Sequence, residues 1–210
     1  MKTLGILGGL SPQSTLEYYR AINAGVNAAL GGHHSAKILM ASVDFGEFVM
    51  LKAEGNWHRQ GEILAENAAK LEQAGADVII LATNTLHKEA AQIEAAISVP
   101  FLHIGAVTAA AIADASLNKV ALLGTRYTME MDFYKAFLSA HGIETFTPEP
   151  TGIEAIHNII YDELVAGIIS TQSRHVFVEE IERLQERIAK KLGYELVDHR
   201  LELYGRKIKK

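Results

Sequence analysis

Short segments rich in hydroxyl and amide side chains follow three predicted strands, at Gly8–Ser11, Thr83–Thr85 and Gly124–Thr128. Open α/β sheets bind their ligands at the carboxyl ends of their strands, where these segments lie. Each segment also begins a helix, whose free N–H groups favour an anion. Together these groups suit a small carboxylate better than a nucleotide. Helix capping alone would use the same residue types, so the site hypothesis rests on finding three such segments in one chain.

The residues and motifs that several other kinds of site require are absent from the sequence. The chain contains no cysteine, which excludes disulfides, thiolate metal sites and a thiol nucleophile or base. The Gly5-x-x-Gly8-Gly9 pattern is not a dinucleotide fingerprint, and no phosphate-binding Gly-Lys-Ser/Thr loop occurs. His-Glu-x-x-His and Gly-x-Ser-x-Gly are absent as well. We expect His87 and His103 to cap or pack rather than to bind a metal.

The composition is that of a globular protein. Among 210 residues, 49% are hydrophobic and 21% are charged, which excludes a disordered tail protein. The net charge of −5 gives no reason to expect a nucleic-acid partner. No apolar run is long enough to span a bilayer, so we expect no membrane partner and a cytoplasmic location.

Short apolar runs alternate with longer amphipathic ones, which predicts βαβ units and a mainly parallel sheet. After a strand over Thr3–Leu7, Ser11 and Pro12 form a typical N-cap and first-turn pair for a helix. We predict one helix over Trp57–Gln73, because its apolar residues recur at helical spacing, and another over Met129–Ala140.

The two halves of the chain resemble weak copies of each other. Ile6–Gly9 precedes the helical segment Glu17–Ala21 much as Leu122–Thr125 precedes Asp132–Ala136. Chance similarity between ordinary βα units is the alternative. The pattern favours two pseudo-symmetric parallel-sheet lobes around a cleft. We predict an N-terminal lobe over 1–105, a second lobe over 106–176, and a C-terminal helix and strand over 177–210 that complete the second lobe or dimerise.

Over about residues 1–175 the chain resembles the aspartate/glutamate racemases that work without pyridoxal phosphate, most closely the branch acting on L-aspartate and L-glutamate. The matching segments are Met1–Gly9 with Ser11, Ser42–Phe45, Thr83–Lys88, Phe101–Ile104 and Leu122–Met129. The resemblance implies a cytoplasmic, cofactor-independent amino-acid racemase, an aspartate or glutamate substrate, and a homodimer.

The resemblance also implies a set of site residues. The family uses two bases on opposite faces of the substrate Cα, usually cysteines. Thr83 occupies the first of these two positions, and a threonine there is similar to the L-specific branch. Val197 lies near the second position. Thr83 is therefore the expected catalytic residue. The expected substrate-binding residues are Gly9, Leu10, Ser11, Lys52, Asn84, Thr85, Thr125 and Thr128.

From about Phe177 the sequence is similar to the end of the dimerisation domain of ferric-uptake regulators. In that family a helix Glu and a later His bind metal, and they match Glu182 and His199. Because the other ligands are missing, we expect a structural role and no metal site. Because the chain has neither of the family's two cysteines, we expect an impaired racemase. Two alternatives stay open. One is an inactive homologue that binds small dicarboxylic amino acids, and the other is a self-associating or metal-linked module.

Overall fold

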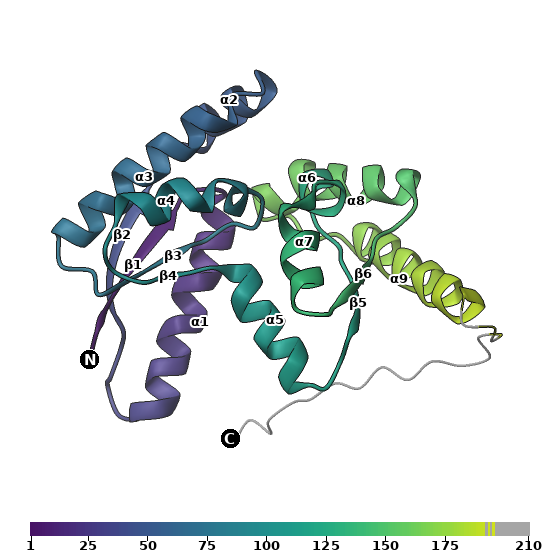
Figure 1. Cartoon of the computed structure of the whole chain (residues 1–210), viewed down its shortest axis with the longest axis horizontal. Helices are drawn as coiled ribbons and strands as arrows, with labels where there is room; N and C mark the ends of the chain where they lie inside the picture. Colours follow the sequence, from purple (N-terminus) through teal and green to yellow (C-terminus); the bar gives the residue numbers. More distant parts are fainter. Residues whose placement is uncertain (192, 194, 196–210) are drawn as a thin grey trace.

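A computed structural model describes residues 1–191, 193 and 195. Along this part of the chain, strands alternate with helices (Figure 1). In chain order the elements are β1 (Thr3–Gly8), α1 (Pro12–Leu30), β2 (Lys37–Ser42), α2 (Phe45–Ala53), α3 (Trp57–Gln73), β3 (Val78–Leu81), the 3₁₀ helix η1 (Thr85–Glu89), α4 (Ala90–Ala96), β4 (Phe101–Leu102), α5 (Ile104–Asp114), β5 (Lys119–Ala121), α6 (Arg126–Glu130), α7 (Asp132–Ala140), β6 (Glu144–Phe146), α8 (Pro150–Asp162), the 3₁₀ helix η2 (Leu164–Ala166) and α9 (Thr171–Lys191).

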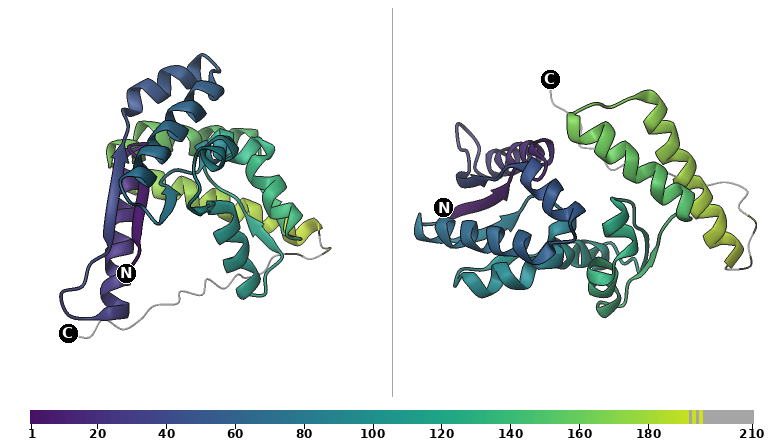
Figure 2. Two further views of the ribbon diagram at one scale, coloured as in Figure 1. Left: turned by 60° about the vertical axis from the view of Figure 1, so that its left-hand side comes forward. Right: turned by 90° about the horizontal axis from the view of Figure 1, so that it is seen from above.

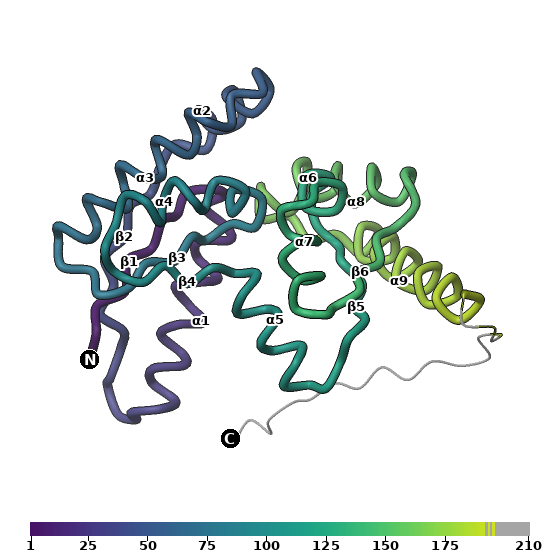
Figure 3. The backbone as a smooth tube through the Cα atoms, viewed as in Figure 1, coloured from purple at the N-terminus to yellow at the C-terminus, as the bar shows by residue number. Residues whose placement is uncertain are grey.

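The strands form two parallel sheets, which confirms the predicted α/β fold class. The first has the order β2-β1-β3-β4, so that β1 is central, and Gly5 of β1 lies opposite Leu39 on one side and Ile79 on the other. The second sheet pairs β5 with β6. We call the parts around these sheets the first and second lobes. Figure 3 shows α5 leading the chain from β4 in the first lobe to β5 in the second.

The core of the first lobe lies between α3 and the sheet. Leu64, Ala68 and Leu71 recur at helical spacing along α3 and are almost fully buried. They pack with Ile79 and Leu81 of β3 in one apolar cluster. Burying one leucine or isoleucine side chain contributes roughly 1.5–3 kcal/mol to the free energy of folding. This packing fixes the end of β3, from which the segment containing Thr83 continues.

The second lobe has smaller clusters of its own. Tyr134, Leu138 and Ile143 form one apolar cluster with Ala109.

The predicted helix over Met129–Ala140 is wrong as one element, because the backbone is extended at Met131 and separates α6 from α7. The sequence analysis also missed α2 and α5, which carry apolar residues on most of their faces and so lack a clear helical periodicity.

The long helix α9 packs against the second lobe, beside α8 (Figure 2). Leu184 is 2% exposed at this contact. Arg187 pairs with Glu149 just before α8, and Lys191 donates to Glu144 of β6 over 2.9 Å. Thus α9 is held against the second lobe by an apolar contact and by ion pairs to Glu149 and Glu144.

The C-terminal predictions fall largely outside the described residues. The strand expected at the end of the segment 177–210 lies outside the described residues apart from Glu195, and Val197 and His199 lie outside them as well. Glu182 is exposed on α9. Within residues 1–191, 193 and 195, no three His, Asp or Glu side chains are grouped closely enough to hold a metal ion. None of the helices among these residues has the length and apolar character needed to cross a membrane.

Candidate active site

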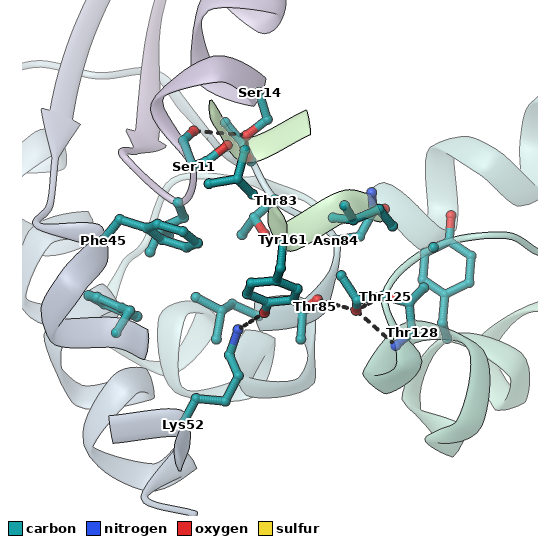
Figure 4. Close-up of a pocket in the computed structure, with 18 of the residues that line it drawn as sticks. Ser11, Ser14, Phe45, Lys52, Thr83, Asn84, Thr85, Thr125, Thr128 and Tyr161 are labelled. Atoms are coloured by element: carbon teal, nitrogen blue, oxygen red, sulfur yellow. Dashed lines mark hydrogen bonds between the residues drawn. The ribbon is translucent and has the colours of Figure 1, made fainter. Parts of the chain in front are cut away.

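A cavity of about 380 Å³ lies between the two lobes, and all three hydroxyl-rich segments line it (Figure 4). They arrive from the ends of β1, β3 and β5. Helices α2 and α8 add walls from opposite lobes. Of the residues expected at the site, the structure brings together Leu10, Ser11, Lys52, Thr83, Asn84, Thr85, Thr125 and Thr128. Gly9 is not part of the lining, and a Cβ built on it would meet the Val43 backbone.

Three threonine hydroxyls form a chain across the boundary between the lobes. Thr85 and Thr125 are joined by their Oγ1 atoms over 3.0 Å, although they follow strands of different sheets. Thr125 Oγ1 lies 3.2 Å from Thr128 Oγ1 and accepts from the Thr128 N–H. Thr125 is thus the N-cap of α6 as well as a link between lobes. Because each hydroxyl can donate or accept a hydrogen bond, this chain of three hydroxyls can reorient to donate hydrogen bonds to an anion.

The first segment is held by side chains at the start of α1. Thr15 Oγ1 accepts from the Gly9 N–H over 2.9 Å, and Ser14 Oγ donates to the Ala82 carbonyl over 2.8 Å. Ser11 occupies the expected N-cap position, but its side chain makes no capping hydrogen bond. The predicted N-cap and first-turn pair is confirmed in position. The Ser11 side chain lines the cavity, while its carbonyl accepts from the Thr15 N–H and hydroxyl.

His87 supports the segment containing Thr83 from behind. Its ring is 3% exposed, and its Nε2 accepts from the Ile104 N–H over 3.2 Å. Nδ1 must then carry the proton, which it donates to the Thr83 carbonyl over 2.8 Å. Burial, and then the nearby His103, lowers the pKa of His87 to about 4. His87 is a neutral brace, and His103 caps α5 by accepting from the Gly105 N–H, as expected for both.

This brace makes stability depend on pH. The unfolded chain binds a proton at His87 below about pH 6.5, whereas the folded chain does so only near pH 4. Folding stability should therefore fall as the pH decreases from 6.5 to 4. Urea unfolding of His87→Gln, which cannot titrate, should show a smaller loss between pH 7 and 4.5 than wild type. The same substitution at exposed His34 is the control. If His87→Gln lost as much folding stability between pH 7 and 4.5 as wild type does, the lowered pKa of His87 would be contradicted.

Lys52 carries the one charged side chain among the described residues that line the cavity. Its Nζ donates to the Tyr161 hydroxyl over 2.6 Å, which links α2 of the first lobe to α8 of the second. The same Nζ lies 5.2 Å from the ring centroids of Tyr127 and Tyr161. Burial lowers the pKa of Lys52 to about 8 and raises that of Tyr161 to about 12.

Thr83 presents its side chain to the cavity from a fixed backbone (Figure 4). Its carbonyl is held by His87, and the Ala82 N–H just before it donates to Leu7 of β1 over 2.8 Å. Sequence reasoning missed several aromatic lining residues. They are Tyr18, Phe45, Tyr134 and Tyr161. All four lie on helices, where an aromatic residue is usually a core residue, so their residue types did not point to the site. Phe45, Tyr18 and Tyr134 do fall in the matching or repeated segments, which was the signal that could have found them.

The model of the Asp/Glu/hydantoin racemase family matches residues 7–192, which include all the described residues of the cavity. The chain belongs to the Asp/Glu/hydantoin racemase family. A crystal structure from Yersinia pestis, provisionally assigned as an Asp/Glu racemase, is 49% identical, covers 89% of this chain and 82% of its own, and superposes with a TM-score of 0.82. The aspartate racemase homologue PH1733 from Pyrococcus horikoshii is 32% identical over 92% of this chain and 82% of its own, with a TM-score of 0.73.

The chain spans less than two thirds of the length of the curated relatives that it matches. The broad specificity amino-acid racemase RacX of Bacillus subtilis is 27% identical over 149 residues, which are 67% of this chain and 62% of RacX. The ferric uptake regulation protein of Rhizobium leguminosarum is 71% identical over 57 residues, only 27% of this chain and 37% of that regulator. The similarity to the regulators is thus confined to a short stretch of this racemase-family chain.

Proposed function

We propose that this racemase-family protein binds aspartate or glutamate between its lobes and interconverts the enantiomers without a cofactor, at a low rate. The observation that carries the proposal is the composition of the cavity, where one cation lies among hydroxyl groups from three strand ends. One carboxylate of a dicarboxylic amino acid fits the hydroxyl chain of Thr85, Thr125 and Thr128. The other fits Lys52, which faces no carboxylate partner in the described part of the chain.

The low rate follows from the residues available for proton transfer. Racemisation moves a proton from one face of Cα to the other and needs a positioned acid and base. A cysteine with a pKa of about 8.5 is a few per cent thiolate at neutral pH, whereas a threonine hydroxyl is far weaker as an acid. Thr83 lines the cavity at the expected first position, and the whole chain lacks cysteine. The same observation favours the second candidate function, an inactive homologue that only binds the amino acid.

Calorimetry tests the binding half of this proposal. L-aspartate, D-aspartate and L-glutamate should each release or absorb heat at millimolar concentration. Asparagine should bind more weakly, because its side-chain amide lacks the negative charge that favours hydrogen bonds from the hydroxyls of Thr85, Thr125 and Thr128. No heat with any of the acids, or equal binding of asparagine, would contradict the proposed substrate class. Dimerisation, a cytoplasmic location and the predicted lobe boundaries remain parts of the proposal.

Thr125→Val should weaken aspartate binding by about 1–3 kcal/mol, or roughly 5- to 150-fold in Kd, if its hydroxyl pairs with a buried carboxylate. The substitution keeps the shape of the side chain but removes the centre of the hydroxyl chain. Calorimetric titration gives the change in Kd. Thr151→Val, at an exposed position at the start of α8, is the matched control and should bind as wild type does. Equal affinity in both variants would remove Thr125 from the binding site.

A further inference from the structure

We propose that Lys52 is the acid–base residue that exchanges the Cα proton on the side of the cavity opposite Thr83. This inference rests on the proposed function, because it assigns the missing partner of Thr83 in the same site. Figure 4 shows Lys52 extending into the cavity from α2, while Thr83 enters from the far side. A substrate between them would present one face of Cα to each.

The position of the Lys52 amine is well defined. The Tyr161 hydroxyl lies 2.6 Å from Nζ, and the rings of Tyr127 and Tyr161 flank the amine. The tyrosine hydroxyl accepts from the ammonium form and can donate to the neutral amine, so this contact survives both protonation states. Tyr161 therefore holds the nitrogen in one place while the proton comes and goes.

The other groups of the cavity are poorly suited to proton transfer near neutral pH. Within the described residues, its titratable lining side chains are Lys52, Tyr18, Tyr134 and Tyr161. Burial raises the pKa of Tyr18 above its usual value and that of Tyr161 to about 12, but lowers that of Lys52 to about 8. Serine and threonine hydroxyls are weaker acids still. With a pKa of about 8, Lys52 offers both protonation states between pH 7 and 9.

The groups that face Lys52 do not hold it in the charged state. They are Tyr161 and His157 on α8 and Tyr127 on α6. From α3, the side chain that joins this cluster is Trp57, which packs edge-on against Tyr127 and does not titrate. None of these is a carboxylate, and a carboxylate is the neighbour that would favour the ammonium form.

The proposed step balances within the site and water. The neutral Lys52 amine takes the proton from Cα, so the Cα–H bond breaks, an N–H bond forms, and the electron pair moves into the adjacent carboxylate as an enediolate. Return of a proton from the Lys52 ammonium restores the same enantiomer. Inversion requires a proton from Thr83 on the opposite face, which its hydroxyl supplies slowly. The Thr83 oxygen then regains a proton from water, and the Lys52 ammonium gives its proton to the hydroxide that remains, so both groups return to their starting states. Exchange at Cα should therefore outpace inversion for the enantiomer whose Cα–H faces Lys52.

Lys52→Arg and Lys52→Met separate this role from simple attraction of a carboxylate. Arginine keeps the positive charge but does not deprotonate in proteins, whereas methionine keeps only the length. The readouts are calorimetric binding of aspartate and loss of the Cα–H NMR signal of L- and D-aspartate in heavy water. Lys88→Arg is the matched control, since Lys88 also lies over an aromatic ring, Trp57, but pairs with Glu89 outside the cavity.

We expect Lys52→Arg to bind aspartate within about threefold of wild type and to lose at least about 100-fold in exchange. Lys52→Met should lose both, and Lys88→Arg neither. Wild-type exchange should rise through about pH 8, as the amine loses its proton, and then level off. If either Lys52 variant proves unstable, ethylamine added to Lys52→Ala should restore exchange.

The contrary results distinguish the two proposals. Binding by wild type with undiminished exchange in Lys52→Arg would overturn the role of Lys52 and leave the proposed function intact. Binding by wild type without any exchange would also overturn that role. Absence of aspartate and glutamate binding by wild type would instead overturn the proposed function itself.

Discussion

Replacing Gly9 with alanine should destabilise the protein by about 3 kcal/mol or more and disturb the first wall of the cavity. Gly9 has a φ of +88°, a conformation that side chains rarely adopt. A Cβ added there would lie 2.3 Å from the Val43 carbonyl oxygen and 2.7 Å from the Val43 nitrogen. Both atoms belong to the backbone, so relief requires moving the chain after β2. Urea unfolding monitored by circular dichroism measures the loss.

Gly25→Ala is the matched control for this substitution. Gly25 lies within α1, and a Cβ there would meet no atom within 4 Å. Alanine is better than glycine in a helix by about 0.5–1 kcal/mol, so this variant should be slightly stabilised. A Gly9→Ala variant as stable as Gly25→Ala would show that the first segment does not have the described conformation.

Thr83→Cys should raise the racemisation of aspartate by at least about 100-fold over wild type. The thiol is a far stronger acid than the hydroxyl, and it would act from the side of the cavity opposite Lys52. Exchange without inversion should then give way to inversion of both enantiomers. Chiral chromatography of the product mixture over time measures the rate directly.

The effect of the new cysteine should depend on Lys52. In Thr83→Cys/Lys52→Arg the gain in racemisation should disappear, because one face of Cα again lacks a proton carrier. Thr3→Cys, which places a thiol in β1 away from the cavity lining, is the control for nonspecific thiol chemistry. Full racemisation by the double variant would show that another group supplies the second proton.

Elements with strong periodicity could be predicted from the sequence. The helix α3 has the predicted bounds, because its buried side chains recur along one face and Gly75 ends it with a φ of +99°. The break at Met131 could not be foreseen, since Met and Asp are both acceptable within a helix. The alanine-rich α5 offered no pattern, and its start at Ile104 depends on capping by His103.

The site was partly predictable for a topological reason. Parallel strands of one sheet bring their carboxyl ends to one edge, so Gly8–Ser11 and Thr83–Thr85 could be placed together from the strand pattern. Gly124–Thr128 follows a strand of the other sheet, so its approach depends on how the lobes are packed. The contact of Lys52 with Tyr161 spans 109 positions and depends on how the lobes are packed. No local pattern encodes it. The low pKa of Lys52 follows from burial in that packing and was equally beyond sequence reasoning.

The packing of the C-terminal helix α9 depends on its amphipathic pattern. In α9 an apolar stripe that includes Leu184 packs against the second lobe, while charged residues cover the other face. Any amphipathic helix with the same period could provide this packing, whichever family supplied it. The match to the racemase family model accordingly extends through α9 to residue 192.

The central claim is that the cavity between the lobes binds aspartate or glutamate and exchanges its Cα proton. Proton NMR of L- and D-aspartate in heavy water with the wild-type protein tests it most directly. At pH 8.5 we predict a slow, protein-dependent loss of the Cα–H signal that exceeds the formation of the opposite enantiomer. A Cα–H signal that stays as constant with the protein as in the protein-free buffer, for both enantiomers of aspartate and of glutamate, would contradict the account.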